Sequence, residues 1–286
     1  MSAKITFTKK LMNFSDQALN EIYREIFNCS GDDKNFNHLL KPEYFFNVFF
    51  SKFLTDDLKK INQFVRFELT YKEILNLLIS YDKERIFSKN KNIKLAYLLL
   101  NEKKISKENK EKIKEKRKDK KKLIEGYFAS FQGRKSGSVD ITILENTRSD
   151  ESKGLPRKLI ELKTDSNNLQ AIKKDIQRVA DFMVWYIDSE NGNLNSFQET
   201  ALVIVGNNNH HEKIKSCYQE VTDSYNFNCI TPIIIQNTIV MKDPTFDPAP
   251  DENPERIVYK IGCTVISFVR CPDGDKLAAE NQSPPE

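Results

Sequence analysis

Residues 138–144, near the middle of the chain, alternate between apolar and polar side chains with the two-residue period of a β-strand. Successive side chains of a strand point to opposite faces, so we expect Asp140 and Thr142 on one face. The other face, which is predicted to seek the core, carries Val139, Ile141 and Ile143. The pattern therefore predicts a strand with one acid beside a hydrophobic core.

A second strand pattern follows at residues 158–164, where Glu161 and Lys163 share one face. The connection from Asp140 to Glu161 is polar, contains Gly154 and Pro156, and is long for a hairpin. If the two strands pair, two carboxylates and one ammonium converge beside the core. This set suits a divalent cation bound to an anionic substrate, and phosphodiester hydrolysis is the chemistry it indicates.

The helical period takes over after the second strand. Residues 168–187 place one apolar stripe on a predicted helix, with Leu169, Ile172, Ile176, Val179, Met183 and Ile187. If a strand at 127–131 is counted as the first element, the expected order is strand, strand, strand, helix, strand, helix, strand. The remaining strands of this order are predicted at 201–205 and 231–235, and its second helix at 212–225. A further strand is predicted at 256–270. The order predicts a mixed α/β fold.

The first hundred residues are expected to be helical. We predict helices at 15–28 with Ser15 as N-cap, at 43–53, after Thr55, after Thr70, and at 91–100. Thr70 and Glu73 have the spacing of a capping box. The many phenylalanines in this region are typical of a helical core or a partner interface.

The two strands resemble the PD-(D/E)XK nuclease superfamily, the restriction-endonuclease-like enzymes. Asp140 matches the first acid and Glu161-Leu162-Lys163 matches the (D/E)XK tripeptide, while Val139 stands where the motif name has proline. The resemblance implies a restriction-endonuclease-like mixed sheet flanked by helices. It also implies Mg²⁺, with Mn²⁺ as substitute, held by Asp140, Glu161 and the Leu162 carbonyl, with Lys163 orienting or activating the attacking water.

Two further site residues follow from the same resemblance. Glu125, just before Gly126, corresponds to an extra acid that the helix before the first catalytic strand often supplies. Gln177, or Gln170, corresponds to a glutamine that the following helix places near the metal in several such families. Both glutamines and Glu125 are equally compatible with an ordinary solvated helix face.

The positive charge of the chain is concentrated in one segment. The formal net charge is +4, but residues 103–122 carry twelve basic and four acidic side chains, a local net charge of +8. Such a segment is predicted to contact nucleic-acid phosphates, although a solvated connector has the same composition. The expected contacts are Lys114, Lys116, Arg117, Lys118, Lys120, Lys121 and Lys122, followed by Lys173 and Lys174 on the helix at 168–187.

Composition limits the remaining possibilities. The chain has 286 residues, of which 39% are hydrophobic and 30% charged, as expected of a soluble protein with a real core. We expect no membrane partner and a cytoplasmic location, because no apolar run reaches membrane-spanning length and the beginning lacks a signal-peptide core. The five cysteines are scattered without a C-x-x-C pair, which is typical of reduced thiols.

These observations predict a metal-dependent nuclease acting as an endonuclease, on DNA in preference to RNA, in restriction or anti-phage defence. The alternative is a non-catalytic nucleic-acid-binding or scaffolding subunit that keeps the fold. A protein partner or a homodimer is expected to use the N-terminal region. The predicted division is a helical accessory region at 1–102, a basic connector at 103–122, a nuclease core at 123–242, a linker with an additional strand at 243–270, and a disordered tail at 271–286.

Overall fold

The computed structural model of the chain describes the sheet and the helices that flank it. The described ranges are 4–30, 43–58, 63–81, 137–146, 154–164, 167–184, 197–227, 229–242 and 257–271. The predicted strand at 127–131, the predicted helix at 91–100, the basic segment at 103–122 and the predicted tail after residue 271 lie outside these ranges.

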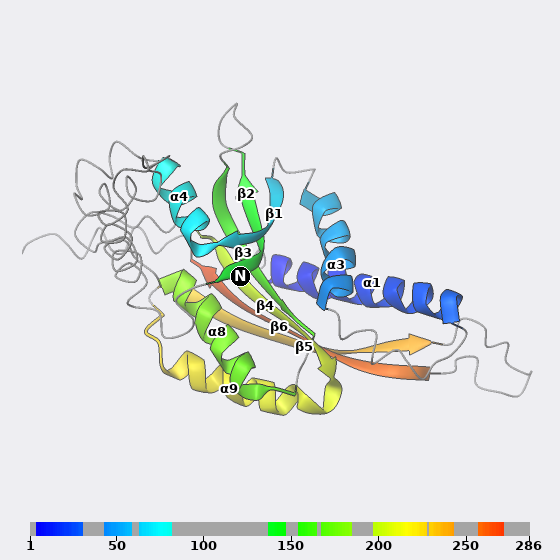
Figure 1. Cartoon of the computed structure of the whole chain (residues 1–286). Coiled ribbons are helices and arrows are strands. Elements are labelled where there is room, and N and C mark those ends of the chain that lie inside the picture. Colours follow the sequence, from blue (N-terminus) through cyan, green and yellow to red (C-terminus); the bar gives the residue numbers. More distant parts are fainter. Residues whose placement is uncertain are drawn as a thin grey trace, which may run out of the picture.

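A six-stranded mixed sheet forms the centre of the molecule, in the order β1-β2-β3-β4-β6-β5 (Figure 1). Its first three strands are antiparallel neighbours, β3 and β4 run parallel, and β6 is antiparallel to both β4 and β5. The strands are β1 (Gln63–Thr70), β2 (Ser138–Glu145), β3 (Leu155–Lys163), β4 (Glu199–Asn207), β5 (Ile230–Lys242) and β6 (Ile257–Arg270).

Helices cover both faces of this sheet (Figure 1). On one face, α1 (Lys4–Ser30) and α3 (Glu43–Leu58) bury their apolar side chains against strands β2 to β6. On the other face, α4 (Tyr71–Tyr81), α8 (Leu169–Val184) and α9 (His211–Asp223) pack over a second hydrophobic cluster. A short 3-10 helix, η5 (Asn208–His210), joins β4 to α9. The predicted mixed α/β architecture is confirmed.

The predicted elements around the motif are confirmed with small shifts in their ends. The two motif strands are β2 and β3, the helix after them is α8, and the later strand, helix and strands are β4, α9, β5 and β6. The last strand is not peripheral, because β6 pairs along its length with both β4 and β5.

The N-terminal region differs from the prediction in three places. Gln63–Thr70 is not helical but forms the edge strand β1, which pairs with β2. No helix begins after Thr55, because α3 continues through it to Leu58. Ser15 caps nothing, since it lies inside α1 and donates its hydroxyl to the Leu11 carbonyl at 2.8 Å. The helices α1 and α3 thus form a layer that packs on the same sheet.

The predicted capping box at Thr70 is confirmed. The Glu73 carboxylate accepts hydrogen bonds from the Thr70 amide at 2.8 Å and hydroxyl at 2.6 Å, and the Thr70 hydroxyl accepts from the Glu73 amide at 3.2 Å. These bonds hold the Glu73 carboxylate in its ionised form and lower its pKa. The capping box stands where β1 ends and α4 begins.

Of the helices described, none combines the length and the apolar character that a membrane crossing needs.

Candidate functional site

The pairing of β2 with β3 brings the two motif acids opposite each other. The register joins Ile141 to Ile160, so its next position joins Asp140 to Glu161. The Asp140 carboxylate accepts a hydrogen bond from the Leu162 amide at 2.7 Å, where the backbone ladder between the strands has ended. The side chain of Asp140 thereby continues the pairing in place of a backbone carbonyl, and this fixes its position beside Glu161.

Glu161 is buried although it is an acid, with only 3% of its surface exposed. Its Oε2 atom lies 2.7 Å from Nη2 of Arg178, while Oε1 is buried without a hydrogen-bond partner among the described residues. Burial raises the pKa of Glu161 well above its usual range, the Arg178 guanidinium opposes this rise, and the Asp140 charge adds to it. The two carboxylates are close enough for a proton on one to bond to the other.

Arg178 contacts the acid pair, but it was not among the site residues predicted from the sequence. It lies on α8, one residue after the expected Gln177, and it also contacts Asp175 at 3.1 Å. Its side chain is only 11% exposed. A sequence pattern could have indicated Arg178. Beside the apolar stripe of α8, the residues Ala171, Asp175, Arg178 and Phe182 recur at helical spacing and are partly or fully buried. A helix-borne cation thus faces the carboxylate that the strand presents.

The side chains of β2 do not follow one regular alternation of faces through the site, although a regular alternation was expected. Val139 belongs to the cluster under α4 and α8, whereas Ile141 and Ile143 belong to the cluster under α1 and α3. The neighbouring strand changes face at the same level, because Glu68 has a left-handed φ of 51° and the regular pairing skips it. A reversal of faces in both strands therefore occurs at Glu68 and Asp140.

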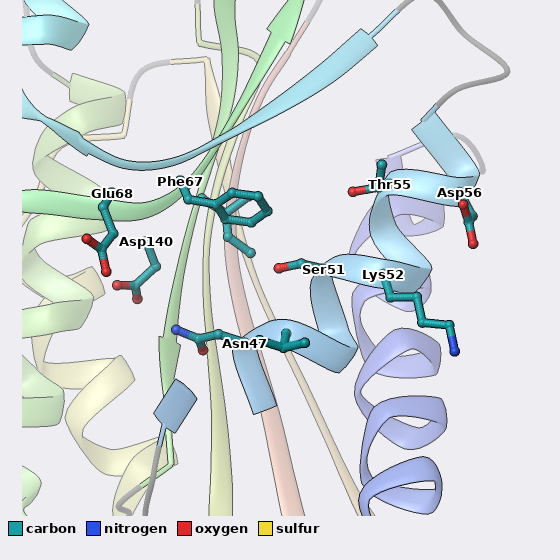
Figure 2. A pocket seen from close by; sticks show the side chains of 10 residues that line it. Asn47, Ser51, Lys52, Thr55, Asp56, Phe67, Glu68 and Asp140 are labelled. Carbon is teal, nitrogen blue, oxygen red and sulfur yellow. The ribbon is translucent and has the colours of Figure 1, made fainter. Parts of the chain in front are cut away.

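Glu68 is a third acid at this site, and it was not among the predicted site residues because residue 68 was expected in a helical region. Its exposed side chain lies beside Asp140, and the two carboxylates face the same space (Figure 2). The alternation of Val65, Phe67 and Leu69 with polar residues was a strand signal that could have revealed it.

Lys163 and Gln177 occupy the elements predicted for them. Lys163 ends β3, pairs with Ile204 of β4 and is half-buried, two residues along the strand from Glu161. Gln177 is half-buried on α8, and its backbone carbonyl accepts a hydrogen bond from the Tyr225 hydroxyl at 3.3 Å. On α8 it is Arg178 that contacts the acid pair, and no contact between Gln177 and these acids is described.

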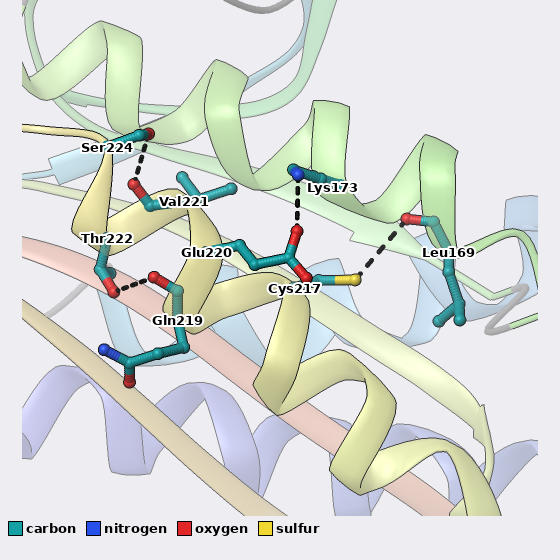
Figure 3. A network of polar contacts seen from close by, with 8 residues as sticks. All are labelled: Leu169, Lys173, Cys217, Gln219, Glu220, Val221, Thr222 and Ser224. Carbon is teal, nitrogen blue, oxygen red and sulfur yellow. Dashed lines mark hydrogen bonds and ion pairs between the residues drawn. The ribbon is translucent and has the colours of Figure 1, made fainter.

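The predicted phosphate contacts on α8 lie at the surface. The Lys173 ammonium is bound to Glu220 of α9 at 2.6 Å, which links the two helices (Figure 3). Lys174 is exposed. Glu125 and the basic side chains expected to contact nucleic acid lie outside the described residues, namely Lys114, Lys116, Arg117, Lys118, Lys120, Lys121 and Lys122.

The chemistry of the donor set fits a hard divalent cation. Two carboxylates side by side favour a proton or a cation between them, and Oε1 of Glu161 has no hydrogen-bond partner among the described residues. Oxygen ligands of this kind are those that Mg²⁺ prefers, and it keeps several waters. Within the described ranges no three His, Cys, Asp or Glu side chains form a cluster that could hold a metal, so the fit depends on Asp140, Glu161 and the Leu162 carbonyl.

Comparison of the chain with protein-family models, with curated proteins and with solved structures finds no match. Any function of the chain therefore has to be inferred from the site itself.

Proposed function

We propose that the protein is a metal-dependent nuclease with a restriction-endonuclease-like core. The observation that carries this proposal is the half-buried Asp140 beside the buried Glu161 on the neighbouring strand, with one carboxylate oxygen of Glu161 left without a partner among the described residues. Support comes from the elements that follow the first motif strand, since β2 and β3 are antiparallel, α8 comes next in the chain and β4 then runs parallel to β3, in keeping with the mixed sheet that the resemblance implies.

Each residue has a physical role in this proposal. Asp140, Glu161 and the Leu162 carbonyl would hold the cation, which when bound supplies charge neutralisation at the phosphate and a more acidic water. Lys163 contributes a positive charge beside the phosphate, where negative charge grows during hydrolysis. Arg178 holds Glu161 through its 2.7 Å ion pair and so positions that carboxylate.

DNA is the proposed substrate, and restriction or anti-phage defence is the proposed setting. The alternative function is a non-catalytic nucleic-acid-binding subunit. One observation favours it: the Arg178 guanidinium already neutralises the Glu161 carboxylate, as a site without a cation requires. The two functions differ in whether Asp140 and Glu161 bind a metal, and this difference can be measured.

The test is cleavage of supercoiled, linear and single-stranded DNA and of RNA, with Mg²⁺ or Mn²⁺, with Ca²⁺, and with EDTA. We expect Asp140→Asn, Glu161→Gln and Lys163→Met each to lower the cleavage rate by at least about a hundred-fold, because residues acting as a unit lose function together. EDTA should stop cleavage, and Ca²⁺ should allow binding with little turnover.

Asp223→Asn, an exposed carboxylate on α9, is the matched control and should keep full activity. Circular dichroism and thermal melting establish that each variant is folded. Equal cleavage in EDTA, or activity that survives all three site substitutions, would overturn the proposal. Binding without cleavage of any substrate in any metal would favour the non-catalytic alternative.

A further inference from the structure

A cavity of about 570 Å³ opens between α3 and the edge of the sheet, directly beside Asp140 (Figure 2). Its sheet side is formed by Phe67, Glu68, Asp140 and Ile141, and its helix side by one face of α3. A cavity of this size is large enough for a small organic ligand or one nucleotide. Since Asp140 lines the cavity and belongs to the acid pair, a ligand there would adjoin the proposed reaction centre.

The cavity gathers the exposed apolar side chains of the described structure. The large hydrophobic residues that stay exposed are Phe67 at 54%, Val48 at 48% and Val240 at 36%, and the first two line this cavity. Exposed apolar surface that is concentrated at one place usually marks a binding site. An exposed aromatic ring is in addition a flat face on which another ring can stack.

The cavity also contains polar atoms without partners. Ser51 is buried, with 7% of its surface exposed, yet its hydroxyl has no hydrogen-bond partner among the described residues, and neither does Oδ1 of Asn47. Both side chains extend from α3 toward Asp140 (Figure 2). Leaving a buried polar group without a hydrogen bond is destabilising, so such groups normally have a partner.

A second buried serine in the same helical layer makes the local hydrogen bond that Ser51 lacks. Ser15 on α1 is fully buried and donates its hydroxyl to the carbonyl of Leu11, four residues earlier, at 2.8 Å. This local bond is the usual solution for a serine inside a helix. The Ser51 hydroxyl, in contrast, has no partner among the described residues, and Ser51 is one of the residues that line the cavity.

The charges around the cavity decide against an anion as its occupant. The carboxylates of Glu68 and Asp140 lie on the cavity side, whereas the Asp56 and Lys52 side chains, although those residues also line the cavity, extend away from the sheet (Figure 2). The Lys52 ammonium is also 3.4 Å from Glu21. A phosphate would be repelled, whereas a neutral, flat and hydrogen-bonding group meets a complementary surface.

We infer that this cavity receives an unpaired nucleobase next to the scissile phosphate, and that the substrate is therefore single-stranded or locally unpaired nucleic acid. The Phe67 ring stacks on the base, and the Asn47 amide and the Ser51 hydroxyl bond to its polar edge. A base inside an intact duplex cannot enter, because both of its faces are stacked and its edge is paired. The inference rests on the proposed nuclease function, whose phosphate would lie at Asp140 and Glu161.

The first experiment measures binding. A fluorescent single-stranded DNA or RNA oligonucleotide and the corresponding duplex are titrated by anisotropy in Ca²⁺, which prevents turnover. Phe67→Ala should weaken single-strand binding by at least about five-fold, as expected when the ring that stacks on one base is removed, and change duplex binding by less than about two-fold. Phe67→Trp keeps an aromatic face and should bind single strands as well as the wild type.

Ser51→Ala separates a binding role from a structural one. If the hydroxyl serves the ligand, its removal weakens single-strand binding while the melting temperature stays the same or rises, because an unsatisfied group has been deleted. The matched control is Val240→Ala, an exposed apolar side chain on β5 at the opposite edge of the sheet, which should change neither quantity.

The outcomes distinguish this inference from the proposed function. Metal-dependent cleavage with equal single-strand binding by the wild type and Phe67→Ala would overturn the base site and leave the nuclease intact. Loss of single-strand binding in Phe67→Ala without cleavage by the wild type would overturn the nuclease and retain a base-binding site. A wild type that does not bind single strands would overturn the base site, and one that in addition cleaves no substrate, duplex DNA included, would overturn both.

Discussion

At the scale of single residues, Glu68 combines an unfavourable backbone with a place at the candidate site. Its φ of 51° lies in the left-handed region, which costs a residue with a side chain about 1–2 kcal/mol. Strain of this kind collects where function requires a particular side-chain position. Here the strained residue directs its carboxylate toward Asp140 and turns Phe67 to the opposite face from Leu69 (Figure 2).

Substitution of Glu68 by glycine and by alanine separates strain from chemistry. Both variants lose the carboxylate, but only glycine adopts the left-handed backbone without a steric cost. We expect Glu68→Gly to be more stable than Glu68→Ala by about 0.5–1 kcal/mol, after allowance for the greater entropy of glycine in the unfolded chain. Chemical denaturation measures the difference. If alanine proves as stable as glycine, the strain at residue 68 is absent.

At the scale of elements, the strands β3 and β4 carry a second pair of charged residues, the half-buried Lys158 and the buried Glu199, on the face covered by α1. Lys158 and Glu199 are register partners, and the Thr8 hydroxyl of α1 donates to Glu199 at 3.2 Å. The Lys158 ammonium lies 3.3 Å from the centre of the Phe7 ring. Burial raises the pKa of Glu199 to about 7 and lowers the pKa of Lys158, while each charge opposes the shift of the other.

Lys158→Met should destabilise the protein in a pH-dependent way. The folded pKa of Glu199 is raised above its unfolded value, so the stability that its protonation contributes is complete below about pH 4.5 and is lost as the pH rises through about 7. Without Lys158 this pKa rises further. We expect a loss of about 3 kcal/mol at pH 8, measured by urea denaturation, and a much smaller loss at pH 5.

Two controls accompany this measurement. The double variant Lys158→Met with Glu199→Gln should recover most of the stability, because no buried charge is left unpaired. Lys173→Met breaks the exposed ion pair with Glu220 and should change the stability little at either pH. A pH-independent loss in Lys158→Met would mean that packing of the lysine stem, rather than its charge, stabilises the sheet.

The end of the sheet near Gly154 gives a second prediction at this scale. A Cβ atom added there would lie 2.7 Å from the Phe64 ring of β1 and 2.8 Å from the Cβ of Leu144 in β2. Gly154→Ala should therefore cost about 1–3 kcal/mol in thermal or chemical unfolding, the usual cost of overpacking. A smaller residue in place of Phe64, as in Phe64→Leu, should recover part of the loss. A neutral Gly154→Ala would contradict the close packing of these three strands.

At the scale of the whole molecule, the sheet joins segments that are far apart in the chain. The strand β1 pairs with β2, and residues 71–137 leave and return at one point, where the Tyr71 amide donates to the Gly137 carbonyl at 3.1 Å. The basic segment at 103–122 belongs to this excursion. Both ends of this stretch of chain are therefore covalently joined to the strands that carry Glu68 and Asp140.

We therefore predict that the basic segment supplies the phosphate affinity of the protein. Neutralising Lys114, Lys116, Arg117, Lys118, Lys120, Lys121 and Lys122 should weaken binding of all nucleic-acid sequences alike. It should also reduce the slope of log affinity against log salt by about one unit for each phosphate that the protein no longer neutralises. Titrations at several salt concentrations measure the slope. Superimposable slopes for wild type and variant would assign the segment to another role, such as a connector.

The sequence alone determined the elements that carry the two motif acids. Alternation in β2 and β3, the apolar stripe of α8 and the capping box at Thr70 are local patterns, and each produced the expected element. The pairing that brings Asp140 to Glu161 also followed from the sequence, because a hairpin between neighbouring strands needs no information from the rest of the chain.

Only the tertiary structure decided which other side chains join those acids. Gln63–Thr70 becomes a strand because β2 offers it hydrogen bonds, although this partner lies beyond residue 137 in the chain. Arg178 reaches Glu161, and Ser51 and Phe67 come to line one cavity, only after α8 and α3 pack on opposite faces of the sheet. A local pattern, such as the alternation in Gln63–Thr70 or the spacing on α8, can indicate a strand or a helix face, but it does not say which distant residues that element will meet, because those contacts depend on hydrogen bonds and burial between distant segments.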